Sequence, residues 1–304
     1  MAAVTDTPVK GKMLRATKLG PCGDPVFVAG GWPVQVVTKG FVSVEYSAEV
    51  DDGEEIDQRD ANGDSCVYVP ARRRIKFYNV TVTACRVDPE LYSLFTGSPI
   101  VVDEDGVSTG LRVTSAVNQD SAVALELWSG TAQKRCSGSA VNRRPRFGYF
   151  LLPQILDGQI GDFTIENGTA NFTLTGKAVE NPEWGTGPYP VYLRTAGVAP
   201  LADPMGEQDL LHLDWTTLPP PAPTAGLVPR PAEGTLTANG LKATFTASFA
   251  PPGGYTLDWG DGWVTPGVAV GAPATHDYTE AGTYLVTVTD TASGGQRFLS
   301  VAVA

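Results

Sequence analysis

The alternation of hydrophobic and polar residues along this chain predicts β-strands far more often than helices. The clearest case is the segment 161–175, in which the dipeptide Asn167-Gly168 favours a two-residue hairpin turn. Such a turn pairs Phe163 with Phe172 and places the apolar residues of both strands on one face of a sheet. A single hairpin is not stable alone, so the flanking chain must supply further strands.

Other segments share this period of two. In the segment 41–50, valine, tyrosine and alanine alternate with serine and glutamate, which predicts a half-buried strand. The segment 75–87 is apolar on both faces and predicts a central strand. Residues 1–20 have no clear period, and we expect an extended arm there. Further strands are expected at 111–117, 122–128 and 147–152.

One segment, 88–97, has the pattern of a helix. Asp88 is a good N-cap, Pro89 suits the first helical position, and Gly97 is placed to end the helix. Its apolar stripe consists of Leu91, Leu94 and Phe95.

Prolines gather between Thr216 and Pro231, a composition that favours a semi-rigid polyproline spacer. We therefore expect a domain at 1–217, a linker at 218–232 and a second domain at 233–304. The chain length of 304 residues also suggests two domains, at about 150 residues for a typical domain. Turn residues in the last segment recur at the spacing of an immunoglobulin-like sandwich. Its expected strands are 236–237, 243–249, 255–259, 284–289 and 298–303.

The composition excludes several classes of protein. A hydrophobic content of 42% and a mean hydropathy of −0.06 are ordinary for a globular protein. No apolar run approaches the ~18 residues of a membrane helix, and the pattern of the first residues does not predict a secretory signal. The four cysteines are expected to be reduced thiols rather than a disulfide framework. The net charge of −11, spread over both sides of Pro219, argues against tight binding to nucleic acid.

The segment Glu49–Ser65 is strongly acidic, and we expect it to be a long, mobile loop. A calcium loop is the alternative, because Asp60, Asn62 and Asp64 alternate. The EF-hand pattern then requires Gly and Glu where this chain has Ser65 and Ala71, so we expect no metal. The eight carboxylates are Glu49, Asp51, Asp52, Glu54, Glu55, Asp57, Asp60 and Asp64.

Basic residues form compact groups that could pair with these carboxylates. One interpretation is that the acidic loop docks on a basic patch of a neighbouring copy and orders on assembly. The alternative is that Arg72–Arg74 pairs with its own loop. For the other basic groups, solvated strand ends and turns are the favoured interpretation. The candidate counter-patch consists of Arg72, Arg73, Arg74, Arg143, Arg144 and Arg146, with Lys134 and Arg135 nearby.

The sequence predicts neither an enzyme nor a cofactor site. It has two histidines, His212 and His276, and lacks the motifs of a nucleophile elbow, a P-loop, a zinc protease and a dinucleotide fold. The loop Asn181–Pro190 carries Trp184 and Tyr189, which we expect to fold back as a plug rather than to stack a ligand.

The last segment carries an ordered motif. Trp259-Gly260-Asp261-Gly262 is followed by His276-Asp277-Tyr278 and then by Gly282 and Tyr284. In this it resembles a PKD domain, an immunoglobulin-like sandwich whose relatives mediate adhesion to extracellular proteins or carbohydrates. The resemblance implies structural roles for Trp259, Asp261, His276, Tyr278, Gly282 and Tyr284.

The segment 1–217 resembles the major tail protein of siphophages. The resemblance rests on the strand 41–50, the acidic segment after it, the short helix, the run RPRFGYFLLPQ and the run GDFTIENGTANFTLTGKA followed by NPEWGTGPYPV. It implies a mainly β tail-tube domain, a β-sandwich or barrel, that stacks as hexameric rings around a channel, with the Ig-like domain outside.

This resemblance also implies partners and a location. The partners would be further copies of the chain, the tape measure protein, and the tail terminator and tip proteins, and genome DNA would pass without specific binding. The location would be the virion, after assembly in the host cytoplasm. The alternative is a surface adhesin or carbohydrate-binding protein that carries a PKD module, which would need a secretory segment.

Overall fold

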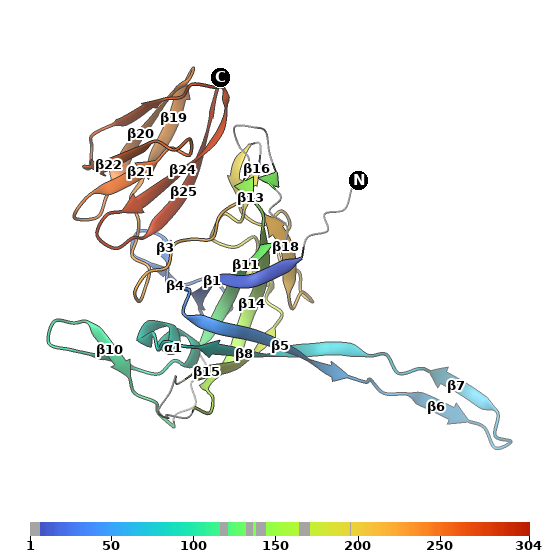
Figure 1. Ribbon diagram of the computed structural model, residues 1–304. Coiled ribbons are helices and arrows are strands. Elements are labelled where there is room, and N and C mark those ends of the chain that lie inside the picture. Colours follow the sequence, from blue (N-terminus) through green and yellow to red (C-terminus); the bar gives the residue numbers. More distant parts are fainter. Residues whose placement is uncertain (1–6, 116–120, 132–135, 138–143, 164–170, 195) are drawn as a thin grey trace.

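The computed structural model describes residues 7–115, 121–131, 136–137, 144–163, 171–194 and 196–304. The fold is mainly β, with 55% of residues in strands and one short α-helix. Figure 1 shows a large sheet in the middle of the molecule, a separate group of strands at the C-terminal end, and a long hairpin that projects from the sheet.

The large sheet has eight strands and is antiparallel throughout its pairings. Along the order β4-β1-β11-β14-β15-β8-β5 the strands are Gln35–Thr38, Pro8–Leu19, Ala122–Thr131, Phe147–Ile160, Phe172–Val179, Arg74–Ala84 and Phe41–Asp51. The eighth, β18 (His212–Thr216), pairs with the first half of β14, and β15 pairs with the second half.

Small two-stranded ribbons surround this sheet. They are β2 (Phe27–Val28) with β3 (Trp32–Pro33), β6 (Ile56–Arg59) with β7 (Ser65–Val69), β9 (Ile100–Val102) with β10 (Ser108–Leu111), β12 (Cys136–Ser137) with β13 (Arg144–Pro145), and β16 (Tyr192–Arg194) with β17 (Gly197–Ala199).

The expected N-terminal arm is wrong in its described part, because Pro8–Leu19 is the long internal strand β1. β1 and β11 are covered on both faces. Leu14 and Ala16 belong to one hydrophobic cluster of the large sheet, and Met13 and Leu19 belong to the other. A strand that is buried on both faces loses the alternation that marks a half-exposed strand, which is why the sequence pattern missed it.

The predicted helix is confirmed as α1 (Pro89–Thr96). The Asp88 side chain accepts hydrogen bonds from the backbone N–H groups of Glu90 and Leu91, and Gly97 ends the helix at a φ of 67°. α1 packs on one face of the large sheet so closely that a Cβ on Gly158 would lie 1.8 Å from the carbonyl oxygen of Phe95.

The expected register of the hairpin 161–175 is shifted by one residue in its described part. A two-residue turn at Asn167-Gly168 would pair Ile160 with Thr175, whereas the structure pairs Ile160 with Leu174. A bulge between Leu156 and Gln159 changes the register of β14 against β15 just before this point. The turn itself, 164–170, lies outside the described residues.

Other strand predictions are partly correct. The segments 75–87, 122–128 and 147–152 lie mostly within β8, β11 and β14. The expected strand at 111–117 is wrong in its described part, because β10 ends at Leu111. Strand β5 confirms the strand predicted at 41–50. Its apolar residues, however, are not all buried. Val44 and Tyr46 pack on the core, and Val42 and Val50 are exposed.

The C-terminal strands form two sheets around a third hydrophobic cluster, which consists of residues between Ala232 and Val303. One sheet, β19-β20-β23, contains Glu233–Asn239, Lys242–Phe249 and Ala274–Asp277; the other, β22-β21-β24-β25, contains Val264–Val268, Tyr255–Asp258, Gly282–Asp290 and Gln296–Val303.

The proline-rich segment is attached to the large sheet rather than held away from it. The backbone N–H of Thr224 donates to the carbonyl of Val37, and that of Val228 donates to the carbonyl of Gln35. These bonds run along β4, so the segment covers one edge of the large sheet. The spacer interpretation missed this contact because polyproline conformation is set locally and says nothing of what the segment packs against.

Candidate assembly surface

The acidic segment is part of a projecting hairpin, which we call the arm (residues 50–74). Strands β5 and β8 leave the large sheet and lead into β6 and β7 (Figure 1). The segment therefore contains strands and is not an irregular loop throughout, and its mobility stays a prediction. At the tip, one carboxylate oxygen of Asp60 accepts hydrogen bonds from the backbone N–H groups of Asn62 (2.8 Å) and Asp64 (3.0 Å), and Gly63 has a φ of 89°. The Asp60 carboxylate therefore closes a tight turn, which is a common role of Asp in turns that contain Gly.

The base of the arm contains ion pairs within the same chain. Asp52 lies 2.6 Å from Arg73, and Asp51 lies 3.3 Å from Arg74. A hydrogen bond from the Gly53 N–H, assisted by Arg74, lowers the pKa of Asp51. Within a single chain, Arg73 and Arg74 therefore pair with their own acidic segment, as the alternative interpretation expected. Exposed pairs of this kind contribute little to stability, so they leave the arm free to exchange partners.

The arm also exposes apolar side chains. β6 and β7 pair Ile56 with Val69 and Gln58 with Val67, which places three apolar residues on one face of the ribbon. The exposed fractions are 51% for Ile56, 46% for Val67, 60% for Tyr68 and 47% for Val69. An isolated two-stranded ribbon has only marginal stability in water. A surface of this composition on such a ribbon is typical of a segment that binds another protein.

The two edges of the large sheet differ. The proline-rich segment covers β4, whereas the last strand at the other edge is β5, beside which the described residues provide no further strand. An uncovered edge presents unpaired backbone groups that another chain can use as a template. β5 is also the strand that continues into the arm, so the open edge and the exposed ribbon form one continuous surface.

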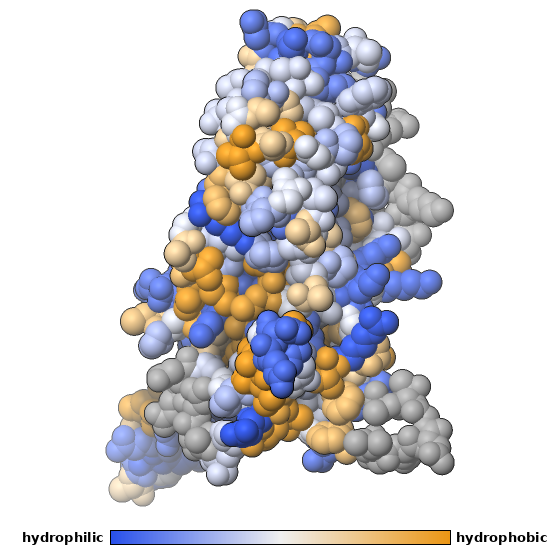
Figure 2. Space-filling view, turned by 90° about the vertical axis from the view of Figure 1, so that its left-hand side faces the viewer, coloured by the Kyte–Doolittle hydropathy of each residue, from blue (hydrophilic) through white to orange (hydrophobic). Residues whose placement is uncertain are grey.

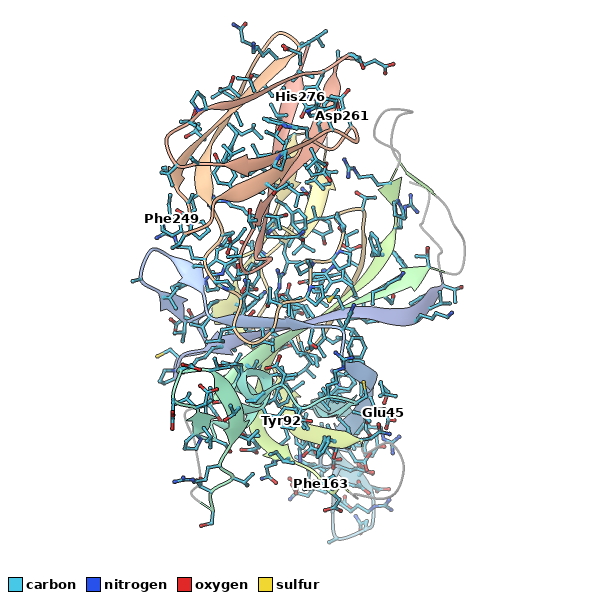
Figure 3. The ribbon with its side chains drawn as sticks, turned by 60° about the vertical axis from the view of Figure 1, so that its left-hand side comes forward. Glu45, Tyr92, Phe163, Phe249, Asp261 and His276 are labelled. Atoms are coloured by element: carbon cyan, nitrogen blue, oxygen red, sulfur yellow. The ribbon has the colours of Figure 1, made fainter. Side chains whose placement is uncertain are left out.

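One face of strands β5, β8 and β15 is rich in hydroxyl groups. The register aligns Ser43, Thr83 and Thr173 in one row, Glu45, Thr81 and Thr175 in the next, and Ser47, Asn79 and Lys177 in a third. Figure 3 places Glu45 on the lower part of the molecule, away from the C-terminal strands. The opposite face carries a row of the partly buried Val44 and the buried Val82 and Leu174, which belong with α1 to one hydrophobic cluster.

The charges on the hydroxyl face are few and nearly balanced. Lys177 forms a 2.9 Å ion pair with Asp157, and Glu45 is the remaining charged residue in the three rows. Such a face offers no basic track to a phosphate backbone.

The described members among the other basic groups of the candidate counter-patch come from different parts of the chain. Arg144 lies in β13, where burial lowers its pKa against the opposing effect of Asp258 in β21. Arg146 follows in the same stretch, and Arg72 precedes β8. Lys134, Arg135 and Arg143 lie outside the described residues.

The PKD-like motif is built into the C-terminal core. Trp259, Tyr278 and Tyr284 are buried, and the Tyr278 hydroxyl donates to the carbonyl of Trp259 (2.9 Å). Asp261 accepts a bond from the backbone N–H of Trp263, as expected for a turn residue, and Gly282 begins β24.

The sequence did not reveal the second partner of Asp261. Its other carboxylate oxygen lies 2.7 Å from Nε2 of His276, and Figure 3 shows the two side chains meeting. The His276 ring is stacked between Trp259 and Trp263 and meets Tyr278 edge-on. Asp261 therefore fixes both a turn and an aromatic stack.

The plug interpretation of the segment 181–190 is confirmed. Trp184 and Tyr189 are buried in the second hydrophobic cluster, and the segment begins with a single 3₁₀ turn, Pro182–Trp184. The Arg15 guanidinium lies over the Tyr189 ring at 3.5 Å, a contact with no signal in the sequence because the two residues are 174 positions apart.

Side chains suited to catalysis are dispersed. His212 Nε2 lies 3.9 Å from the carboxylate of Asp214 beside the Tyr192 hydroxyl, and His276 belongs to the aromatic stack. The described cysteines Cys22, Cys66 and Cys85 are free thiols. Among the residues that the structure describes, no three or more His, Cys, Asp or Glu side chains are grouped to hold a metal ion.

The sequence matches no protein-family model and no curated protein. No helix in the described part of the chain has the length and apolar character needed to cross a membrane.

Proposed function

We propose that the chain is the repeating subunit of a hollow tube and that the arm and the open edge of β5 join one copy to the next. The observation that carries this proposal is the arm, a two-stranded ribbon that keeps apolar side chains in water when the chain is alone. A second copy of the same chain is the partner that a homo-oligomer always supplies.

The resemblance of the segment 1–217 to siphophage major tail proteins suggests which kind of tube the chain forms. In this proposal, stacked hexameric rings form the phage tail tube, and the C-terminal strands, with their PKD-like motif, decorate its outside. The hydroxyl face of β5, β8 and β15 lines the channel. A face with little net charge, in a protein of net charge −11, lets DNA pass without holding it.

Negative-stain electron microscopy of the purified full chain tests assembly, with a paired set of variants. Val67→Thr with Val69→Thr keeps β-branched side chains but makes the arm polar, and we expect it to abolish rings and tubes. The matched control is Val102→Thr with Val107→Thr on the exposed β9-β10 hairpin, which we expect to assemble normally. Equal assembly by both variants, each with an unchanged melting temperature, would contradict the role of the arm.

A second set of variants tests the acidic residues of the arm. Neutralising Asp51, Asp52, Glu54 and Glu55 to Asn and Gln should slow tube growth if these groups bind a neighbouring copy. The wild-type tubes should then also weaken at 1 M salt, where the screening length falls to about 3 Å. Unchanged growth would contradict this role and leave Asp52 and Asp51 only in the pairs with Arg73 and Arg74 that the single chain contains.

An adhesin remains the alternative, and one observation favours it. The ring of Trp263 is 63% exposed, and its stacking on His276 holds it in place. A rigid exposed indole is a suitable platform for a sugar ring or another flat ligand. Monodisperse particles that bind a glycan array through Trp263 would support this function and contradict the tube.

A further inference from the structure

A groove of about 860 Å³ lies where β5 begins, beside the first turn of α1. Its walls come mainly from residues 38–41, from the segment 84–91 that joins β8 to α1, and from residues 223–227 of the proline-rich segment. We call this hollow the groove. This side of the molecule faces the viewer in Figure 2, where hydrophobic side chains (orange) gather on the surface below the C-terminal strands.

The groove keeps apolar side chains in contact with water. Val87 is 40% exposed and Leu227 is 41% exposed, and they come from two different walls. Phe41 adds a partly buried ring. Val107 of the β9-β10 hairpin also borders the groove, but it is the most exposed of the large apolar side chains there, at 58%, and lies outside the contact proposed below. Exposed apolar groups gathered in this way are typical of a surface that binds protein.

Two cations of the groove form no ion pair within the described part of the chain. They are Lys39 and Arg86, and both are exposed. The two carboxylates of the groove are engaged within the chain, because Asp88 caps α1 and Glu90 accepts a hydrogen bond from the hydroxyl of Ser108. The groove therefore offers two positive charges to a partner that carries carboxylates next to apolar groups.

The arm has the complementary arrangement. Its apolar face, Ile56 with Val67 and Val69, comes directly after Glu54 and Glu55 in the sequence. Both glutamates are exposed, and neither forms an ion pair with another described residue. The aspartates at the base of the arm, in contrast, already pair with arginines. Two unpaired carboxylates beside an apolar face therefore match two unpaired cations beside an apolar groove.

The arm and the groove of one chain lie at opposite ends of the same two strands. The register of β5 against β8 pairs Phe41 with Ala84 at the groove and Asp51 with Arg74 at the base of the arm. The 11 residues of β5 separate these ends by about 35 Å, at ~3.3 Å per residue. Figure 1 shows the arm pointing away from α1 and β10. The arm therefore meets the groove of another copy rather than its own.

We propose that the arm of one copy binds in the groove of the next copy. The apolar face of the arm covers Val87 and Leu227. The two glutamates that precede this face pair with Lys39 and Arg86. Because the contact joins two different surfaces, it runs head to tail and can close a ring. It rests on the proposed function, since it names the surface that receives the arm in the assembly.

Two variants of the full chain test the contact by complementation. The arm variant is Val67→Thr with Val69→Thr, and the groove variant is Lys39→Glu with Arg86→Glu. All four residues are exposed, so both variants should melt like the wild type; if the groove variant does not, Lys39→Ser with Arg86→Ser takes its place. Each variant alone lacks one side of the contact and should remain monomeric. An equimolar mixture keeps one intact arm and one intact groove, so analytical ultracentrifugation should show a heterodimer of twice the 32.0 kDa chain mass and nothing larger.

Charge reversal tests the ion pairs of the contact. Adding Glu54→Lys and Glu55→Lys to the groove variant restores opposite charges between copies, and we expect this fourfold variant to assemble again. The matched control is Lys18→Glu with Lys242→Glu, which gives the same net charge as the groove variant but changes exposed residues outside the groove. We expect the control to assemble like the wild type.

The possible results separate this contact from the tube itself. A mixture that stays monomeric, assembly by the groove variant alone, or no recovery in the fourfold variant would each overturn the contact, and wild-type tubes would then still support the proposed function. Heterodimers in the mixture, with a wild-type chain that forms no rings or tubes, would support the contact and contradict the proposed function.

Discussion

Arg15 and Glu126 face one another across β1 and β11 and form a bidentate ion pair shielded from water, with N···O distances of 2.5 and 2.6 Å. Burial alone would lower the pKa of Arg15, but Glu126 outweighs this effect and raises it. The Tyr149 hydroxyl adds a third bond to Glu126 at 2.6 Å. Two charges are therefore held at the centre of the large sheet because each satisfies the other.

Removing one member of this pair should destabilise the chain strongly. We expect Glu126→Gln to cost about 3–5 kcal/mol of unfolding free energy, because it leaves Arg15 buried without a counter-charge. Urea unfolding measures this cost. Arg15→Met with Glu126→Leu should recover most of the loss, because an apolar pair of similar volume needs no counter-charge. A double variant as unstable as the sum of the single ones would contradict this account.

The buried indole of Trp259 should decide whether the C-terminal strands fold. Trp259→Ala removes a large side chain from the third hydrophobic cluster and is expected to cost about 3–5 kcal/mol. The control is Trp263→Ala, which removes an exposed ring of the same type and should melt like the wild type. Calorimetry of both variants measures the loss of stability. An unchanged melting transition in Trp259→Ala would contradict the prediction.

Asp261 should make the C-terminal strands sensitive to acid. Partial burial would raise its pKa, but the bonds from the Trp263 N–H and from His276 together hold the pKa below its usual value. The stabilisation from a lowered pKa is present above the unfolded value of about 3.9 and is lost as pH falls through the folded value. We therefore expect the melting temperature to fall more steeply below pH 4 in the wild type than in Asp261→Asn. The exposed Asp277→Asn is the control; a wild-type slope in Asp261→Asn would refute the role of this carboxylate.

The C-terminal strands should be dispensable for assembly if the truncation keeps the proline-rich segment that covers β4. A chain that ends at Pro231 keeps the hydrogen bonds from Thr224 and Val228 to β4. A chain that ends at Leu218 exposes that edge and should aggregate or lose stability. Microscopy and melting of both truncations measure this difference. Loss of tubes in the well-folded longer truncation would mean that the C-terminal strands belong to the tube wall.

The sequence predicted those elements whose signals are local. Asp88, Pro89 and Gly97 mark both ends of α1, and each acts through groups within a few residues of itself. The alternation in 41–50 located β5 for a similar reason. β22 and β23 were missed because they are short, and β22 contains both Pro266 and Gly267, which normally mark turns.

Features that depend on distant partners were not predictable. Arg15 is a polar residue in a segment without a clear period until Glu126, 111 residues later, is placed opposite it. The carboxylates of the arm suggested mobility because composition does not show that Asp60 closes a turn or that Asp51 and Asp52 meet Arg74 and Arg73.

Cryo-electron microscopy of particles assembled from the purified full chain tests the central claim most directly. The account predicts a hollow tube of six-fold rings, in which the apolar face of Ile56, Val67 and Val69 is buried against a neighbouring copy and the rows of Thr81 and Thr83 face the channel. A map in which the arm extends into solvent, or in which these threonines face outward, would contradict it, as would a chain that remains monomeric at every concentration.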